Sequence, residues 1–136
     1  MSKKTTPTTI NTIGKRKRAI AHATVRPGKG TVRVNKILLA HYGTAMTRMK
    51  MMEPVILAGD ISTLDIDVRT QGGGVIGQAD AVRLAIARAL VEHDSKLEKT
   101  MLDYDRTLLV ADVRFKEVSK PNKHGKARAA TQKSYR

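Results

Sequence analysis

The chain has 136 residues, with 26 Lys and Arg against 12 Asp and Glu, and a formal net charge of +14. This length is typical of one domain, and the absence of cysteine excludes a disulfide framework and a thiolate-ligated zinc ion. No apolar run approaches the ~20 residues of a membrane-spanning helix, and the N-terminus lacks the apolar segment of a signal peptide. We therefore expect a strongly basic cytoplasmic protein with no membrane partner.

The basic residues are concentrated at the two ends of the chain. Residues 1–52 contain 12 basic residues and no acidic one, and residues 113–136 contain 8 basic residues and 1 acidic one. Residues 53–112, in contrast, contain 6 basic and 11 acidic residues. A protein that only needed charge for solubility would not require this separation, so the distribution favours a polyanionic partner that contacts both ends.

The first third of the chain predicts a lead-in and a β-hairpin. Residues 1–13 are polar and rich in threonine, and we expect them to be a flexible lead-in. Alternating small or apolar and polar residues predict a strand over residues 19–26 and a second one over residues 32–34. The turn-forming residues Pro27-Gly28-Lys29-Gly30 lie between the two, which predicts that these strands pair as a hairpin.

The middle of the chain alternates between helical and extended patterns. Residues 44–57 are predicted to be helical, with Pro54 able to kink or restart the helix. Residues 64–69 alternate strictly between apolar and charged side chains, as in a half-buried strand. After a glycine cluster, residues 78–93 carry an apolar stripe with helical spacing, which predicts a long, well-covered helix.

The elements that follow complete the expected fold. Ser95 with Glu98 three residues later has the pattern of a capping box and predicts a short second helix, and residues 109–115 alternate as in a last strand. Strands, helices and a returning strand indicate an α+β or split βαβ fold, a small, mostly antiparallel sheet with helices on one face. We expect one globular domain over residues 14–117 and an extended basic tail over residues 118–136.

A glycine-rich segment, Gly72-Gly73-Gly74-Val75-Ile76-Gly77-Gln78, joins a predicted strand to a predicted helix. Such a junction presents unpaired backbone N–H groups at the positive end of a helix dipole, where a phosphate can bind. The segment lacks the Gly-Lys-Ser/Thr of a P-loop and the glycine spacing of the dinucleotide fingerprint. A tight turn without a ligand, a contact with a nucleic-acid backbone and a mononucleotide site all remain open.

Two strongly basic segments are further candidates for binding. Lys15-Arg16-Lys17-Arg18 directly precedes a predicted strand, in a region without acidic residues. The run is either a solvated cluster or a set of phosphate contacts; side chains that splay from a strand favour phosphates over base edges. The C-terminal segment 118–136 cannot build a core and would be disordered alone. Fully extended it spans about 60 Å, so it either threads into a folded RNA or only improves solubility.

No arrangement of residues indicates catalysis. The histidines, His22, His41, His93 and His124, lie far apart in the sequence and in different predicted elements. No two of them have the spacing of a helical metal site, and no serine or carboxylate forms an obvious triad with one of them. We therefore expect no catalytic residue, no metal site and no cofactor.

Taken together, these motifs resemble the small-subunit ribosomal protein S-nine family over residues 14–136. The resemblance rests on Gly14-Lys15-Arg16-Lys17-Arg18-Ala19-Ile20-Ala21, on the glycine segment with the following Ala79-Asp80-Ala81, on Ile86-Ala87-Arg88-Ala89-Leu90, and on Gly125-Lys126-Ala127-Arg128 with the final Gln132-Lys133-Ser134-Tyr135-Arg136. The Ser-Tyr-Arg ending and Leu108-Leu109-Val110-Ala111-Asp112 resemble archaeal and eukaryotic members more than bacterial ones.

The resemblance implies a fold similar to the second domain of ribosomal protein S-five and a non-enzymatic role in the head of the small subunit. It implies small-subunit rRNA, peptidyl-site tRNA and neighbouring head proteins as partners, without homo-oligomerisation. The rRNA-binding residues expected are Lys15, Arg16, Lys17, Arg18, Arg69, Gly72, Gly73, Gly74, Gly77, Gln78, Arg83, Lys120, Lys123, His124, Lys126 and Arg128. The tRNA-binding residues expected are Lys133, Ser134, Tyr135 and Arg136.

Two other functions are compatible with the residues. A free architectural protein that binds DNA or RNA outside the ribosome would use the same basic segments. A small phosphotransferase that binds a nucleotide at the glycine segment would lack a loop lysine and an obvious magnesium site. Neither accounts as well for two cationic ends with a long basic tail.

Overall fold

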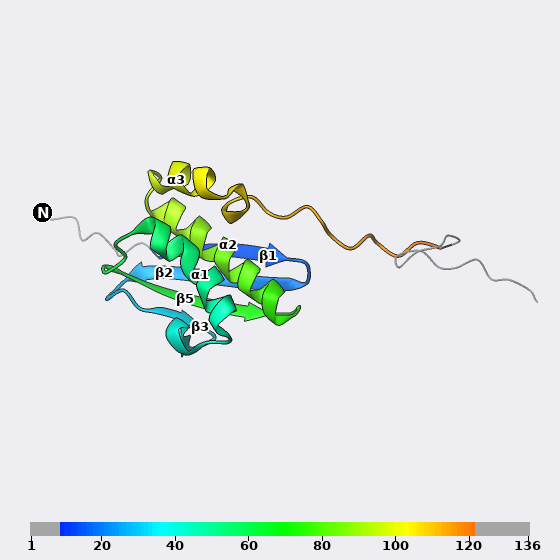
Figure 1. The fold of residues 1–136 in the computed structure, drawn as a ribbon, viewed down its shortest axis with the longest axis horizontal. Helices are drawn as coiled ribbons and strands as arrows, with labels where there is room; N and C mark the ends of the chain where they lie inside the picture. The colour runs from blue at the N-terminus through cyan, green and yellow to red at the C-terminus, as the bar shows by residue number, and fades with distance from the viewer. Residues whose placement is uncertain (1–8, 122–136) are drawn as a thin grey trace, which may run out of the picture.

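The computed structural model describes residues 9–121, which form one sheet with helices packed against it (Figure 1). In chain order the elements are β1 (Ile10–Arg16), β2 (Ala19–Pro27), β3 (Val32–Val34), β4 (Ile37–Leu38), the 3-10 helix η1 (Leu39–His41), α1 (Ala45–Ala58), β5 (Leu64–Gln71), α2 (Val75–His93), α3 (Leu97–Tyr104) and the 3-10 helix η2 (Arg106–Leu108).

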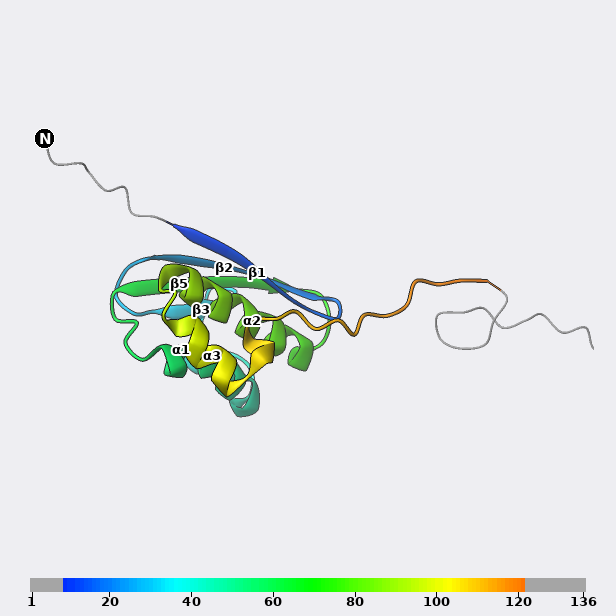
Figure 2. The same ribbon diagram turned by 90° about the horizontal axis from the view of Figure 1, so that it is seen from above.

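The sheet has five strands in the order β1-β2-β5-β3-β4. All neighbouring strands are antiparallel except β3 and β5, which are parallel. The helices lie on one side of the sheet, and no helix formed by residues 9–121 covers its other face (Figure 2). The predicted α+β class, with a small, mostly antiparallel sheet and helices on one face, is confirmed.

Small side chains bring the long helix α2 close to the sheet. The inward residues of β2 are Ala19, Ala21, Ala23 and Val25, each at most 1% exposed, and they face α2 residues that are largely alanine. Gly14 of β1 lies so close to α2 that a Cβ atom there would overlap the carbonyl oxygen of Ala81. The close approach of helix and sheet explains how the fold forms a core with almost no aromatic residues.

The predicted helices are present, and one of them starts earlier than expected. In α1, Thr44 and Thr47 form a reciprocal capping box, and Gly59 with φ of 80° ends the helix. Helix α2 begins at Val75 rather than at residue 78 because Gly74, with an extended backbone, is its N-cap. The predicted capping box at Ser95 is wrong. Helix α3 begins at Leu97 without a side-chain cap, directly after the turn that follows α2.

The predicted hairpin between β2 and β3 is also wrong, because β5 lies between these two strands. The loop of residues 28–31 does not close a ladder; it crosses the start of β5 and is bound there. The carboxylate of Asp65 accepts hydrogen bonds from the backbone N–H groups of Lys29 at 2.9 Å and Thr31 at 3.1 Å. The turn residues therefore reverse the chain, while the partner of both strands comes from a distant segment.

Both ends of the expected domain differ from the prediction. Residues 10–13, expected within the lead-in, form the first half of β1, where the Thr12 hydroxyl donates to the carbonyl of Ala85 at 2.8 Å. The predicted strand over residues 109–115 is wrong, since residues 111–119 have no regular secondary structure. Side-chain bonds hold this segment instead: Arg88 donates to the carbonyls of Leu109 at 3.2 Å and Ile13 at 3.0 Å.

Candidate nucleic-acid interface

The basic run forms the tip of a hairpin. Lys15 and Arg16 end β1, and Lys17 and Arg18 make the turn to β2, so the run closes a two-stranded ladder rather than only preceding a strand. The side chains of Lys15, Lys17 and Arg18 are exposed, whereas Arg16 is partly buried. Three of the four cations are therefore available at one end of the sheet.

The glycine segment packs against this turn. Gly72 and Gly73 have φ of 77° and 64°, values that favour glycine. A Cβ atom at Gly72 would lie 2.6 Å from the carbonyl oxygen of Arg18, and one at Gly73 would lie 3.0 Å from the backbone nitrogen of Ala19. Because Gly72 and Gly73 have no side chains, the start of α2 can lie directly beside the basic turn. This geometry agrees with the interpretation of the glycines as a tight turn.

The N-terminus of α2 also leaves backbone donors available. The first α-helical hydrogen bond runs from Gln78 N–H to the carbonyl of Gly74 at 2.9 Å, so the N–H groups of Val75, Ile76 and Gly77 lie outside the helical ladder. Gly74 contributes no side-chain cap. The Gln78 amide donates to the Gly72 carbonyl at 3.0 Å and ties the glycine turn to the helix. These features suit the binding of an anion at the helix N-terminus.

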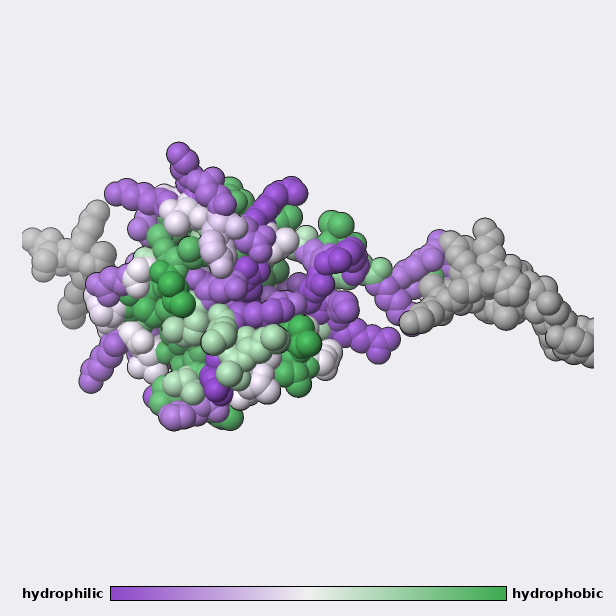
Figure 3. Space-filling view, viewed as in Figure 1, coloured by the Kyte–Doolittle hydropathy of each residue, from purple (hydrophilic) through white to green (hydrophobic). Residues whose placement is uncertain are grey.

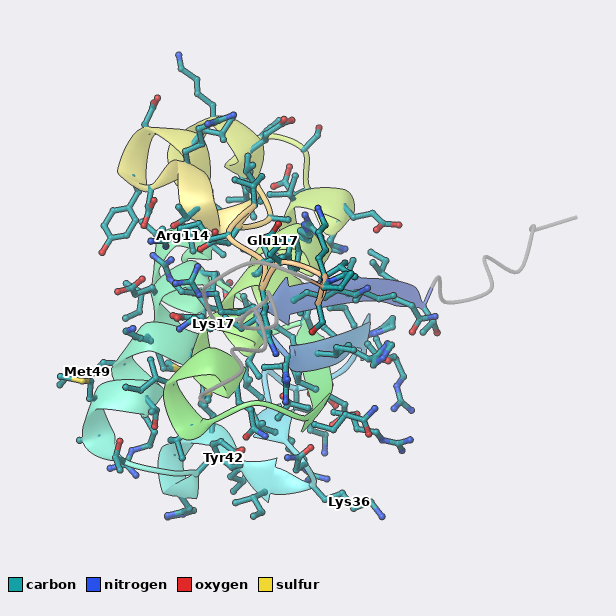
Figure 4. The ribbon with its side chains drawn as sticks, turned by 90° about the vertical axis from the view of Figure 1, so that its right-hand side faces the viewer. Lys17, Lys36, Tyr42, Met49, Arg114 and Glu117 are labelled. Atoms are coloured by element: carbon teal, nitrogen blue, oxygen red, sulfur yellow. The ribbon has the colours of Figure 1, made fainter. Side chains whose placement is uncertain are left out.

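The third part of this site is the segment that leads into the basic tail. Arg114, Phe115 and Lys116 line the same depression, of about 1100 Å³, as the basic turn and the start of α2. Figure 4 looks onto this end of the molecule, with Lys17 and Arg114 both on the side facing the viewer. We call the exposed surface formed by residues 15–18, 72–77 and 114–116 the hairpin-end surface.

Ion pairs within the fold hold the tail segment at the hairpin-end surface. Asp112 forms ion pairs with Arg16, at the end of β1, and with Arg114. The Nη2 atom of Arg114 lies 2.8 Å from the Oδ2 atom of Asp112. Arg16 also lies 3.8 Å from a carboxylate oxygen of Asp80 in α2. The chain therefore leaves the folded part at the end occupied by the β1–β2 turn, as Figures 1 and 2 both show. Hydrophilic residues predominate at that end, with a few apolar ones among them (Figure 3).

Several predicted site residues have other positions. Arg69 is exposed on the uncovered face of the sheet, opposite His22 of β2. Arg83 lies in α2 with 14% of its side chain exposed, and its guanidinium is 2.5 Å from Glu53 and 3.2 Å from Asp105. The charge of Arg83, like that of Arg16, is therefore largely neutralised inside the protein.

Asp105, one of the two acidic residues that contact Arg83, is stabilised in its ionised form. The backbone N–H of Thr107, assisted by Arg83, lowers the pKa of the Asp105 carboxyl. The arginine thus bridges α1, α2 and the start of η2 through two acidic side chains. This arrangement is typical of a residue that stabilises helix packing.

The expected tail residues are only partly within the described range. Lys120 lies 3.4 Å from Glu117 in an i,i+3 ion pair. The rRNA-binding candidates Lys123, His124, Lys126 and Arg128 and the tRNA-binding candidates Lys133, Ser134, Tyr135 and Arg136 lie outside the described residues. Sequence reasoning missed Arg114 and Lys116 as parts of the site because it assigned Arg114 to a strand and Lys116 to the globular domain, although both belong to the basic C-terminal region.

Other kinds of site are not found in the described part of the chain. Within residues 9–121, no three histidine, aspartate or glutamate side chains are grouped as metal ligands would be. No helix in the same range has the length and apolar character needed to cross a membrane. The most distinctive feature is the convergence of exposed cations and unpaired N–H groups at the hairpin-end surface.

Comparison with known proteins identifies the family. Residues 14–136 match the family described as ribosomal protein S9/S16. The chain belongs to this family. The small ribosomal subunit protein uS9 of Methanothrix thermoacetophila is 52% identical over 130 residues, which cover 93% of this chain and 98% of that protein. The uS9 protein of Methanococcus maripaludis strain C7 is 48% identical over 131 residues, with the same coverage of 93% and 98%.

Family membership confirms the resemblance seen in the sequence, including its archaeal character, since both of these relatives are archaeal. The chain is therefore a ribosomal protein with a structural role and not an enzyme. The phosphotransferase interpretation of the glycine segment is thereby excluded. Two interpretations of the glycine segment remain, a tight turn and a nucleic-acid contact. The geometry of the segment is compatible with both at once.

Proposed function

We propose that this ribosomal protein is a constituent of the small subunit in the cytoplasm, where it binds rRNA of the head and supports peptidyl-site tRNA through its tail. The observation that carries the rRNA part is the hairpin-end surface, where Lys17 and Arg18 line the same depression as the open N-terminus of α2 and Lys15 is exposed at the adjoining end of β1. Neighbouring head proteins complete the set of partners, and the protein acts as a single copy.

Two kinds of contact at the hairpin-end surface complement an RNA backbone. Lysine and arginine side chains neutralise phosphates and release the counterions condensed on the RNA, which favours binding at low salt. Backbone N–H groups at the start of α2 fix a phosphate oxygen in one direction. Such contacts position an RNA strand and carry little sequence information, so specificity comes from the shape of the folded rRNA.

The basic tail begins close to the proposed rRNA contact. Arg88 and the Arg16–Asp112 ion pair hold the segment before the tail against β1 and the basic turn. The C-terminal 24 residues, 113–136, carry 8 basic residues and 1 acidic residue, and they start at the hairpin-end surface. A tail that begins at the rRNA contact can continue along RNA to the peptidyl site, where Lys133, Ser134, Tyr135 and Arg136 contact the tRNA.

The rRNA contact can be tested by directed cleavage, since the chain has no cysteine. A Lys17→Cys variant carrying an iron chelate is assembled into small subunits and its hydroxyl radicals are released. We expect cuts in the rRNA backbone close to position 17. The control is Lys99→Cys on the exposed face of α3, which should give fewer cuts at different nucleotides. An absence of cuts from position 17 in assembled subunits contradicts the proposed rRNA contact.

The tRNA contact is tested by removing the last three residues, Ser134 to Arg136. We expect an unchanged thermal unfolding profile and normal assembly into subunits. Retention of peptidyl-site tRNA on these subunits, measured by filter binding, should fall because a guanidinium and its neighbours no longer contact the tRNA phosphates. Unchanged tRNA retention contradicts the role of the tail and leaves the rRNA contact unaffected.

A further inference from the structure

The uncovered face of the sheet has a groove that the proposed function does not use. Strand alternation places every second side chain of β2, β3 and β5 on this face, away from the helices. The groove has a volume of about 920 Å³. It is lined by His22, Thr24, Arg26, Arg33, Asn35, Lys36, Asp67, Val68, Arg69 and Gln71. We call it the sheet groove.

The acidic groups on this face are already engaged. Asp67 lies 3.0 Å from Nη2 of Arg26, which forms one internal ion pair. Asp65, beside it on β5, accepts hydrogen bonds from the backbone N–H groups of Thr31 and Lys29, which hold the pKa of its carboxyl below the usual range. Asp67 is therefore paired with Arg26, whereas Asp65 is held by neutral backbone donors, keeps its charge and attracts Arg33 from a longer distance.

Three cations of the sheet groove have no carboxylate of the described residues within ion-pair distance. Among residues 9–121, no carboxylate oxygen lies within 4.0 Å of the charged nitrogens of Arg33, Lys36 or Arg69. The three come from three different places, namely β3, the β3–β4 turn and β5. Exposed like charges gathered in one groove repel one another, and an anionic partner would relieve this repulsion.

The turn that carries Lys36 is held rigidly. Asn35 and Lys36 have φ of 50° and 68° and form a two-residue turn between the paired residues Val34 and Ile37. Asn35 donates its N–H to the carbonyl of Val68 at 2.8 Å, and its side-chain oxygen accepts the N–H of Thr70 at 2.9 Å. Figure 4 shows Lys36 at the edge of the sheet. A fixed backbone lowers the entropy lost when this lysine binds a ligand.

The sheet groove adjoins the hairpin-end surface along the chain. Gln71, which lines the groove, directly precedes Gly72, and β2 starts at Ala19 immediately after the basic turn. One RNA strand that crosses this end of the sheet can therefore reach both surfaces. Apart from the imidazole of His22, the groove residues include no aromatic side chain on which a base could stack, so the chemistry of the groove suits the RNA backbone better than the bases.

We propose that the sheet groove is a second RNA-binding surface, in which Arg33, Lys36 and Arg69 contact phosphates of the RNA that also binds the hairpin-end surface. The inference rests on the proposed function, because it extends that rRNA contact from the end of the sheet onto its open face. The arginines suit bidentate phosphate contacts and the lysine a point contact.

The test is a full-length Arg33→Gln/Lys36→Asn/Arg69→Gln variant, with asparagine at position 36 because it tolerates positive φ. Its affinity for small-subunit rRNA is measured over a range of salt concentrations. Each lost phosphate contact should reduce the slope of log affinity against log salt by about 0.7 to 0.9, which is roughly 2 to 3 for the three contacts together. The matched control, Lys96→Gln/Lys99→Gln/Arg106→Gln, removes three exposed charges near α3 and should keep the slope close to that of the original chain.

The outcomes separate this inference from the proposed function. If the groove variant keeps the original slope while a variant of the basic turn loses affinity, the inference is wrong and the proposed function stands. If neither variant changes the binding, both are wrong. Crosslinking from Arg33→Cys in assembled subunits distinguishes the partner: crosslinks to rRNA support the inference, and crosslinks only to another protein overturn it.

Discussion

Replacement of Lys15, Lys17 and Arg18 by glutamine should weaken the binding of the full chain to small-subunit rRNA about 100-fold, if each phosphate contact contributes about 1 kcal/mol. These side chains are exposed at the hairpin-end surface, Lys17 and Arg18 in the depression that the start of α2 also lines, so their loss removes charge without opening the core. Binding is measured by filter retention at fixed low salt, and circular dichroism verifies that the sheet and helices are intact.

Arg16 is left unchanged in this variant because it pairs with Asp80 and Asp112 and helps to hold the tail segment. The Lys96→Gln/Lys99→Gln/Arg106→Gln variant again serves as the matched control, since it lowers the net charge by the same amount at a different part of the surface. Equal affinities of the two variants would show that only the total charge matters. That result would contradict a localised contact at the hairpin-end surface.

Gly14→Ala should reduce the free energy of unfolding by about 3 kcal/mol, near the upper end of the range for overpacked cores. A Cβ atom at this position overlaps the backbone carbonyl oxygen of Ala81 and lies 2.7 Å from the backbone nitrogen of Ala85. Backbone atoms of a helix cannot rotate away as a side chain can, so α2 must move away from β1 and lose its packing on the sheet. Urea unfolding followed by circular dichroism measures the change.

The control for this prediction is Gly77→Ala, a second glycine-to-alanine change in the same protein. A Cβ atom at Gly77 has its nearest neighbours at 3.7 and 3.8 Å, which are ordinary contact distances. Because alanine favours a helix over glycine by up to about 1 kcal/mol, this variant should be as stable as the original chain or slightly more stable. A Gly14→Ala protein with unchanged stability would mean that helix and sheet are less closely packed than the structure shows.

The regular elements were predictable because they depend on local patterns. The strict alternation over residues 64–69 and the helical spacing over residues 78–93 are properties of contiguous sequence, and they correspond to β5 and α2. The alternation over residues 109–115 was equally clear but produced no strand, since Val113 and Phe115 are 85% and 61% exposed. Alternation favours an extended chain, but a strand also needs a partner edge, and that partner is not local.

The pairing of the strands required the three-dimensional fold. The turn residues between β2 and β3 suggested a hairpin, yet β5 is inserted between the two strands from about 30 residues further along the chain. A turn decides only that the chain reverses. Which strand becomes the neighbour depends on how the helices cover the buried apolar side chains of β1, β2, β3 and β5.

The candidate site also combines features that are evident from the sequence with features that depend on the tertiary structure. The amino-acid sequence alone determined the family, the cationic ends, the basic run and the glycine segment, because these are matters of composition and contiguous motif. Only the tertiary structure brought the basic turn, the start of α2 and Arg114 together. It also decided which cations are available: Asp112 and Glu53 engage Arg16 and Arg83, while Arg33 and Lys36 have no such partner among residues 9–121. The physical reason is that a side chain's charge belongs to its sequence, but its neutralisation depends on which distant carboxylate the fold places beside it.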